Sequence, residues 1–305
     1  MYVIKHVPED FVVEEISTVR PQQQGKFTYF GLLKKDYTTL EALQRTAAAL
    51  HLPFKHFSCA GNKDRRAVTT QICSVYGAPN LERLKLKDIS VKSIGFGDEP
   101  IHIGQLEGNR FKITIRNLDK MPNFVPRFHN LFGEQRFSTK NADIGRHIVK
   151  REFEQAARTI AELFTNIPKL QDCIAKSDWI GALRSIPRKL LLLFVHSYQS
   201  LLWNKAASVS KAEKLPIVGF GTSVHDDVTK EILREESISP RDFVIKQLPE
   251  ATAEGAERAV WAEAKDLKLG NLEDDELFPG KKKVIVEFFL PKGSYATEFI
   301  QQCCQ

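Results

Sequence analysis

Residues 59–71 read Cys59-Ala60-Gly61-Asn62-Lys63-Asp64-Arg65-Arg66-Ala67-Val68-Thr69-Thr70-Gln71. This stretch places one carboxylate, that of Asp64, among three cations directly after a glycine-bearing turn. Neighbouring cations favour the ionised form of a carboxylate, and glycine permits backbone conformations that can present it. The segment therefore fits a nucleophilic or basic carboxylate working beside a polyanion. A solvated turn with ordinary surface ion pairs is the alternative for so short a match taken alone.

Composition bounds the class of protein. At 305 residues the chain is long enough to bury a full core as one large domain or two ordinary ones. Its five cysteines are odd in number and form no C-x-x-C pair, which indicates a reducing, cytoplasmic compartment. The 44 basic residues exceed the 38 acidic ones, an excess that permits a phosphate-binding face without requiring one. We expect a soluble protein, because the sequence shows no signal-peptide core and no apolar run of membrane-spanning length.

The elements around Asp64 can be predicted from local patterns. Residues 11–16 are short and β-prone, and they follow a proline, so they favour a strand. Thr38 and Glu41 have the spacing of a capping box, and the apolar residues after them recur at helical spacing until Pro53. Residues 70–76 again favour a strand. Asp64 is therefore expected on the connection that leads into this strand, where catalytic side chains are often found.

Residues 110–116 alternate cleanly, which predicts a strand with two different faces. Phe111, Ile113 and Ile115 share the apolar face, and Asn109 has the same parity. The opposite face is expected to carry Lys112, Thr114 and Arg116.

The middle third of the chain changes to a helical period. Apolar residues from 144 to 160 predict one amphipathic helix, and Leu190 to Ser208 predict a buried helix that starts after Pro187. Residues 248–281 are acidic and loop-prone, and residues 284–289 return to strand character. A strand-rich beginning, a helical middle and a final strand suggest that one domain is inserted into another.

Five segments resemble motifs of the TruD family of pseudouridine synthases, in the family's order. Residues 61–69 are similar to its G-x-K-D-x-x-A-x-T motif, and residues 8–15 to its P-x-D-F-x-V-x-E segment. Residues 108–111 resemble G-N-x-F, and residues 290–297 resemble L-P-x-G-S-[FY]-A-T. Residues 130–137 are similar to the N-x-F-G-x-Q-R-F segment that opens the family's inserted domain. Agreement at five places spread from residue 8 to residue 297 is improbable by chance.

The resemblance implies a fold class and a domain organisation. The class is α+β, with a pseudouridine-synthase catalytic domain built on a mixed, mainly antiparallel sheet. An α-rich TRUD domain interrupts it. The catalytic domain would comprise residues 1–127 and 268–305, with the insertion at residues 128–267. RNA is expected to bind in the cleft between the two domains.

The resemblance also implies a function and its site residues. The implied activity is isomerisation of an RNA uridine to pseudouridine, at position 13 of a tRNA, with Asp64 as the nucleophile or base. The substrate-binding residues implied by the motifs are Phe11, Asn109, Phe111 and Tyr295. The neighbouring cations are expected as contacts to RNA phosphates or as charge partners of Asp64, with Lys63 favoured by adjacency over Arg65 and Arg66. Such an enzyme needs no cofactor and no metal, and we expect a monomer.

Three residues differ from the family's motifs, and two other functions are compatible with the sequence. Tyr295 stands where phenylalanine is common, Ser138 where glycine is usual, and His196 where a small residue is usual. The alternative function is a noncatalytic RNA-binding or RNA-folding protein that keeps a base-flipping pocket. A third is a hydrolase or nuclease that uses Asp64 as a base, which would need a second acid or a metal. His56, Cys59 and Cys73 lack the spacing of a zinc site.

Overall fold

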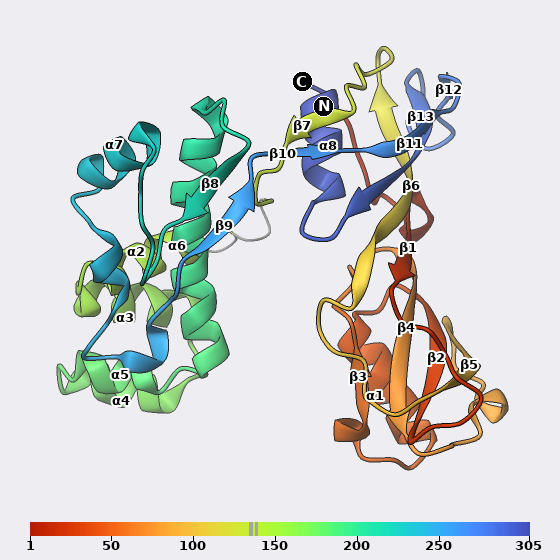
Figure 1. Cartoon of the computed structure of the whole chain (residues 1–305), viewed down its shortest axis with the longest axis horizontal. Helices are drawn as coiled ribbons and strands as arrows, with labels where there is room; N and C mark the ends of the chain where they lie inside the picture. Colours follow the sequence, from red (N-terminus) through yellow and green to blue (C-terminus); the bar gives the residue numbers. More distant parts are fainter. Residues whose placement is uncertain (134–136, 138–139) are drawn as a thin grey trace. The chain divides into compact units, whose positions relative to one another are not determined.

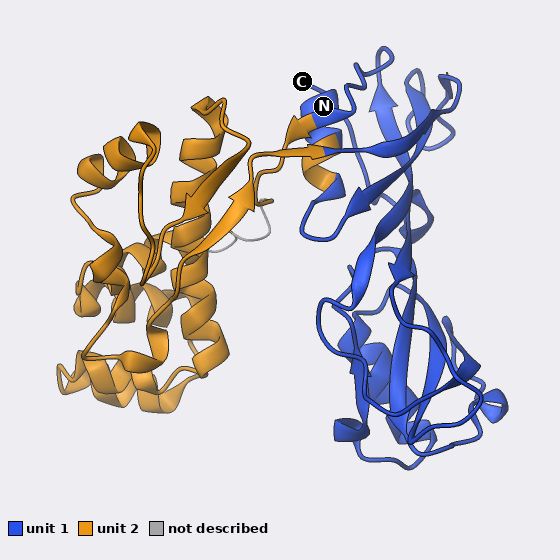
Figure 2. Ribbon diagram, in the orientation of Figure 1, with its two compact units in different colours: residues 1–127, 263–296, 300–305 blue, residues 128–262, 297–299 orange. Residues whose placement is uncertain are grey.

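The computed structural model describes residues 1–133, 137 and 140–305. It divides into two compact units, which Figure 2 colours separately. Unit 1 comprises Met1–Arg127, Glu263–Ala296 and Ile300–Gln305, and unit 2 comprises Phe128–Ala262 and Thr297–Phe299. The domain boundaries expected from the sequence, with an insertion at residues 128–267 and a return to the catalytic domain at residue 268, stay a prediction.

Unit 1 is built on one nine-stranded sheet (Figure 1). Seven strands lie in the order β11 (Lys265–Leu269), β13 (Lys282–Pro291), β6 (Leu106–Leu118), β1 (Phe11–Ser17), β4 (Val68–Tyr76), β2 (Phe27–Lys35) and β5 (Ile89–Gly97). The short strands β12 (Glu273–Asp274) and β3 (Phe57–Cys59) pair with β13 and β4. The β1–β4 pair is parallel and the other pairs of this sheet are antiparallel. The predicted α+β class with a mixed, mainly antiparallel sheet is confirmed.

The strand register places chemically different residues in rows across one face of this sheet. One row joins Lys34 of β2, Thr69 of β4, Val13 of β1, Phe111 of β6 and Phe288 of β13. The next row, two residues further along each strand, contains Gln71, Glu15 and Asn109 between Leu32 and Leu290. Residues that pair directly across strands share a face, so both rows lie on the same side of the sheet.

Helix α1 (Thr39–Ala49) covers part of that face. Its capping box is present as predicted: the Thr38 hydroxyl accepts from the Glu41 amide at 3.1 Å, and the Glu41 carboxylate accepts from the Thr38 amide at 2.8 Å. The helix packs small and apolar residues, among them Leu43 and Ala47, into a core with Phe30 and other residues of β2 and β4. The packing holds the first turn of α1 at the polar row.

Unit 2 is mainly helical. Its helices are α2 (Asn141–Val149), α3 (Phe153–Leu163), α4 (Pro168–Ala175), α5 (Trp179–Arg184), α6 (Arg188–Val209) and α7 (Asp227–Glu235). An antiparallel ribbon of β8 (Lys214–Ile217) and β9 (Ala256–Ala259) accompanies them. A second ribbon pairs β7 (Arg127–His129) with β10 (Trp261–Glu263), and α8 (Ala296–Cys303) ends the chain. Helix α6 is the predicted buried helix, with Pro187 at its N-cap.

Two expectations from the pattern differ from the structure, and the burial of one arginine was not predicted. The single helix predicted around residues 144–160 is two helices, because Arg151 adopts a left-handed backbone with φ 63° and turns the chain between α2 and α3. The segment 248–281 contains short strands as well as loops. Arg116, on the face opposite Phe111, is buried, since Asp10 and Asp275 each accept from its guanidinium at 2.9 Å.

Across residues 1–133, 137 and 140–305, none of the helices combines the length and apolar character that crossing a membrane requires.

Candidate active site around Asp64

Asp64 lies in the loop that connects β3 to β4, as its sequence context predicted. Its Oδ2 atom accepts from the Lys5 ammonium at 3.0 Å, and its side chain is 36% exposed. The other carboxylate oxygen, Oδ1, accepts from no described residue. Lys5 has φ 56°, a left-handed conformation that is uncommon for residues other than glycine. The carboxylate is thus held at one oxygen, with solvent access to the group.

The Lys5 ammonium also lies over an aromatic ring, that of Phe11, at 4.1 Å from the ring centroid. The Phe11 ring meets Phe111 edge to face at 5.9 Å, and Phe111 stacks on Phe288 at 5.4 Å. Such cation–π and edge-to-face contacts are favourable geometries. The three rings therefore form a floor that supports the cation facing Asp64.

This packing changes the role expected of Phe11. Its side chain is only 1% exposed and Phe111 is 7% exposed, because Lys5 and the neighbouring strands cover them. A base cannot stack on the Phe11 ring in this conformation. The expectation that Phe11 packs directly on uracil is not supported, and its contact with the site runs through Lys5.

Buried side chains fasten the rest of the loop. Gln71 donates to the Gly61 carbonyl at 2.9 Å, and the Thr39 hydroxyl accepts from the Lys63 amide at 2.9 Å while it donates to Gln71 at 2.8 Å. Lys34 donates to the Asp64 carbonyl at 2.7 Å. Thr39, Gln71 and Lys34 are each at most 1% exposed. Since packed, hydrogen-bonded side chains hold the backbone, this arrangement can keep a reacting group in one geometry.

The expected partner of Asp64 was wrong. Lys63 donates to the buried carboxylate of Glu15 instead, and its side chain is only 8% exposed, which also removes it from the surface where RNA phosphates would pass. Adjacent residues on an extended backbone point in different directions, so sequence adjacency does not select a partner. Arg65, near Glu41 at 3.6 Å, and Arg66, which donates to the His6 carbonyl, remain exposed.

Asn109 lies close to this network. It pairs in register with Glu15, two residues before Phe111 on the same face of β6. Its Oδ1 atom is buried and accepts no hydrogen bond from any described residue. A buried acceptor without a partner is unfavourable unless a water or a ligand supplies a donor. Gly108 before it has no room for a side chain, because an added Cβ would lie 2.1 Å from the Leu290 carbonyl oxygen.

Tyr295 occupies the N-cap of α8 and is 37% exposed. Leu290, five residues earlier, pairs with Asn109 across β13 and β6. The register therefore directs the end of β13 to the Asn109 end of β6. Convergence of the Tyr295 ring with Asp64 stays a prediction.

The family-like segment at residues 130–137 is described only in part. Gln135, Arg136 and the following Ser138 lie outside the described residues. Asn130 donates to the Ala259 carbonyl at 3.2 Å, and the Arg258 guanidinium lies 4.1 Å from the centroid of Phe132. The described part of the segment thus ties unit 2 together. His196 lies on α6, where Ser200 donates to its carbonyl at 2.7 Å.

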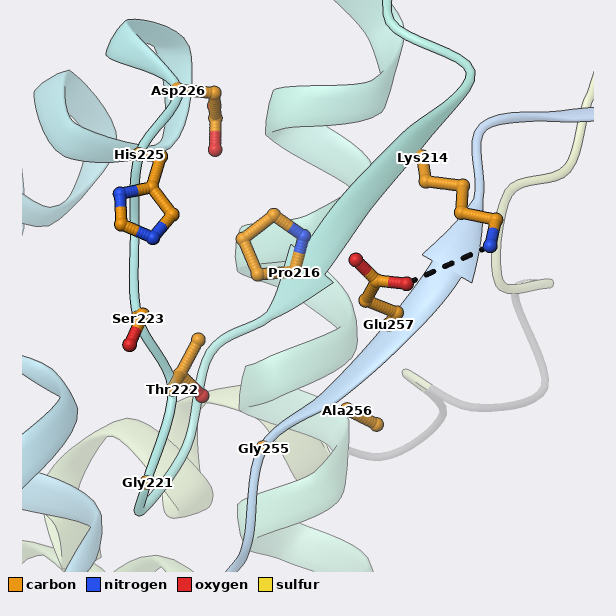
Figure 3. Close-up of a pocket in the computed structure, with 10 residues that line it drawn as sticks. All are labelled: Lys214, Pro216, Gly221, Thr222, Ser223, His225, Asp226, Gly255, Ala256 and Glu257. Carbon is orange, nitrogen blue, oxygen red and sulfur yellow. Dashed lines mark ion pairs between the residues drawn. The ribbon is translucent and has the colours of Figure 1, made fainter.

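A pocket of about 370 Å³ lies elsewhere, in unit 2, between the β8–β9 ribbon and the loop before α7 (Figure 3). Lys214 and Glu257 form a 3.7 Å ion pair on one side of it. Asp226 on the other side caps α7 by accepting from the Thr229 amide at 2.7 Å. These polar groups serve local structure, and none of the predicted site residues lines the pocket. In the described part of the chain, no group of three His, Cys, Asp or Glu side chains is gathered as a metal site requires.

The sequence patterns missed two lysines. Lys5 follows the apolar pair Val3-Ile4, six positions before the first strand begins, and a single lysine there is a weak signal. Lys34 follows Phe30 and Leu32 at a spacing of two, so the alternation of β2 places it on the buried face. A lysine on such a face is a stronger signal, since lysine is almost never fully buried without a partner.

Comparisons with known proteins identify the family of this chain. The family model "tRNA pseudouridine synthase D (TruD)" matches residues 2–170, 165–219 and 210–303. A probable tRNA pseudouridine synthase D from Methanosarcina mazei is 28% identical, with 96% of this chain and 91% of the relative covered. That alignment runs over 401 positions, more than the 305 residues here, so the relative carries insertions that this chain lacks.

A second relative and a solved structure point the same way. The tRNA pseudouridine synthase D of Aquifex aeolicus is 27% identical, with 98% of this chain and 97% of the relative covered. The crystal structure of a putative tRNA pseudouridine synthase D from M. mazei has a TM-score of 0.77 and 26% identity, and the match covers 99% of this chain and 93% of that one. The chain belongs to the TruD family, that of tRNA pseudouridine synthase D.

Proposed function

We propose that this chain is a tRNA pseudouridine synthase that isomerises a uridine, at position 13, with Asp64 as the reacting carboxylate. Family membership supports the reaction class. The observation that carries the choice of residue is the geometry of Asp64: its loop is fastened at Gly61, Lys63 and its own carbonyl, while its carboxylate keeps an oxygen that no described residue occupies.

The reaction breaks the bond between uracil N1 and ribose C1′, turns the base and joins C5 to C1′; C5 then loses its proton and N1 gains one. It is an isomerisation, so no net electron transfer occurs. Asp64 would either attack C1′ to form a covalent adduct or remove a ribose proton to give a glycal. Both routes need a carboxylate next to the ribose, and the free Oδ1 is the atom that would react. Lys5 would hold the second oxygen throughout.

The target base must leave its stack to reach Asp64. Extrusion costs about a few kcal/mol, and stacking on an aromatic ring returns roughly 1–3 kcal/mol per base. Tyr295 is the exposed ring among the predicted substrate residues, and it would take this role. Asn109 would pair its unsatisfied Oδ1 with a donor on a uracil edge, for which N3–H is suited.

Arg65 and Arg66 remain the candidates for contacts to RNA phosphates, since both are exposed next to Asp64. Each guanidinium carries several donors that suit phosphate oxygens. Lys63 is left out of this role because its ammonium is buried against Glu15.

The test is to incubate purified protein with unmodified tRNA and to map carbodiimide adducts by primer extension. Wild-type protein should convert one uridine. Asp64→Asn should reduce the rate by at least about 10³-fold, because the substitution removes the reacting group and keeps its shape. Asp88→Asn, an exposed aspartate of the same unit, is the matched control and should retain full activity.

Two results would count against the proposal. If no uridine changes in any tRNA while RNA binding is retained, the chain is a noncatalytic RNA-binding protein. If Asp64→Asn converts uridine at the wild-type rate, another residue carries the reaction. Loss of an RNA-cleaving activity in chelator would instead indicate a metal-dependent nuclease.

A further inference from the structure

Lys34 is a fully buried cation next to the candidate active site. Its side chain is 0% exposed, and its ammonium donates to the backbone carbonyl of Asp64 at 2.7 Å. It reaches the loop from β2, the strand that pairs with β4 on the far side from β1. Lys34 therefore contacts the backbone of Asp64 and not its carboxylate.

The surroundings of Lys34 offer its ammonium few partners. Its register partner on β4 is Thr69, whose buried hydroxyl has no hydrogen-bond partner among the described residues. The next residue in the row is Val13. Burial lowers the pKa of Lys34 to about 8, the carboxylates of Asp64, Glu41 and Asp36 oppose that change, and the Lys63 ammonium adds to it.

A lysine buried in this way is not expected to increase the free energy of unfolding. A buried charge that lacks a close carboxylate is unfavourable, and an apolar side chain of similar length often serves a fold better. What Lys34 does supply is a fixed distance between β2, an interior strand of the sheet next to the edge strand β5, and the backbone of Asp64. Lys5 supplies a separate contact to the carboxylate.

We propose that Lys34 is a positioning residue for the reaction. Its hydrogen bond to the Asp64 carbonyl fixes the backbone of Asp64 and so sets where the Asp64 carboxylate lies relative to the bound ribose. The proposal rests on the proposed role of Asp64. Together the two lysines hold Asp64 at two points: Lys5 contacts its carboxylate and Lys34 contacts its backbone carbonyl. The Thr39–Gln71 pair fixes the preceding residues.

The hydrogen bond of Lys34 to the Asp64 carbonyl should affect the reaction rate. Catalysis requires the reacting atoms within about 3–3.5 Å and aligned, and a misplacement of about 1 Å can cost 10²-fold in rate. Without Lys34, the Asp64 carbonyl loses its anchor while the surface that binds RNA is unchanged. The rate of the bound complex should therefore fall, with little change in RNA affinity.

The experiment compares Lys34→Met with Lys35→Met. The two lysines are neighbours on β2, but the side chain of Lys35 is 43% exposed and pairs with Glu9. Single-turnover reactions with enzyme in saturating excess over tRNA report the rate constant of the bound complex, which does not depend on the fraction of enzyme that is folded. We expect a fall of about 10- to 100-fold for Lys34→Met, with full final conversion and tRNA affinity within about threefold of wild type. Lys35→Met should match wild type in all three.

The outcomes separate this proposal from the proposed function. A Lys34→Met rate constant equal to wild type, alongside an inactive Asp64→Asn, overturns the positioning role alone. A loss confined to affinity or to final conversion also overturns it, because it indicates a merely structural residue. Wild-type protein that modifies no tRNA overturns the proposed function first.

A second variant keeps the test valid if Lys34→Met does not fold. Lys34→Arg keeps the charge and a donor, but its larger guanidinium must displace the Asp64 carbonyl. A folded Lys34→Arg protein should show the same selective loss of rate constant, and an unchanged rate constant would contradict the proposal.

Discussion

Two carboxylates of this molecule, each surrounded by cations, show opposite designs. Asp64 in unit 1 has a side chain that is 36% exposed, one lysine on Oδ2 and an unoccupied Oδ1 among the described contacts. Glu236 in unit 2 is 8% exposed, and it accepts from Lys205 at 2.8 Å and from the Tyr198 hydroxyl at 3.1 Å. Its Oε2 also lies 3.1 Å from Arg146.

The difference lies in where the hydrogen bonds go. Around Glu236 they end on the carboxylate, so both oxygens are occupied and the group joins α2, α6 and the end of α7. Around Asp64 they end on the loop backbone, at Gly61, Lys63 and the Asp64 carbonyl. A carboxylate with both oxygens bound by buried or nearby partners stabilises a fold, whereas one on an anchored backbone with an unoccupied oxygen can react.

The largest predicted effect on stability concerns Lys34, the buried cation that contacts the Asp64 carbonyl and has no ion-pair partner among the described residues. Lys34 has a folded-state pKa near 8, below the ordinary value of about 10.4, so the unfolded chain binds more protons between these values. The free energy of unfolding of wild type should therefore rise relative to Lys34→Met as pH increases from 8 to about 10.5, by up to about 3 kcal/mol. Urea unfolding at pH 7 to 10.5 measures it, and a difference that stays constant with pH would contradict the buried charge.

The second prediction tests the saturated carboxylate. Glu236→Gln should lower the free energy of unfolding by about 2 kcal/mol, a value reduced from the usual cost of breaking a buried pair because Arg146 and Lys205 are partly exposed. Burial raises the pKa of Glu236, and the cations outweigh that and hold it below its usual range. The difference between wild type and variant should accordingly be present above about pH 4.3 and be lost as the pH falls further. Equal free energies of unfolding for wild type and Glu236→Gln at pH 7 would contradict the stabilising role of Glu236.

The third prediction concerns the single contact on the Asp64 carboxylate. Lys5→Met should slow uridine conversion about 10- to 30-fold, because the carboxylate loses the cation that orients it while its backbone stays anchored. Lys26→Met, another lysine of unit 1 that is exposed, serves as the control. A Lys5→Met rate within twofold of wild type would show that the backbone contacts alone orient the carboxylate.

The smallest effect is chemical labelling at the start of the Asp64 loop. A hydrogen bond from Cys73 lowers the pKa of Cys59 to about 7 against the opposing effect of burial, while burial raises the pKa of Cys73, and that of Cys303 to about 11. Cys59 should react with iodoacetamide severalfold faster than these two at pH 7.5, since the thiolate is the nucleophile. Peptide mass spectrometry measures the order, and earlier labelling of Cys303 would contradict it.

Much of the unit 1 fold could be predicted from the sequence, because alternation and capping act locally. Strands β1, β4, β6 and β13 and helix α1 lie where the patterns placed them. The break at Arg151 could not be predicted, since apolar spacing continues across it while the backbone turns. The burial of Arg116 could not be predicted because its partners, Asp10 and Asp275, are far away in the sequence.

The sequence motifs named candidate residues of the site, but the contacts between those residues and their neighbours could not be predicted. Asp64, Asn109 and Phe111 could be named from short matches, and the register places the last two on one face. The ion pair of Asp64 with Lys5 joins residues 59 positions apart, and only strand pairing brings them together. Local sequence therefore supplied the proposed reacting group, Asp64, and could not supply the lysines that contact it.

One measurement tests the contrast between the two carboxylates most directly: the single-turnover rate of pseudouridine formation by Asp64→Asn and by Glu236→Gln, on the same tRNA and with enzyme in excess. We predict a loss of at least about 10³-fold for Asp64→Asn, with stability close to wild type. Glu236→Gln should retain a rate constant within about threefold of wild type, despite its lower stability. A wild-type rate for Asp64→Asn, or an inactive but folded Glu236→Gln, would contradict the account.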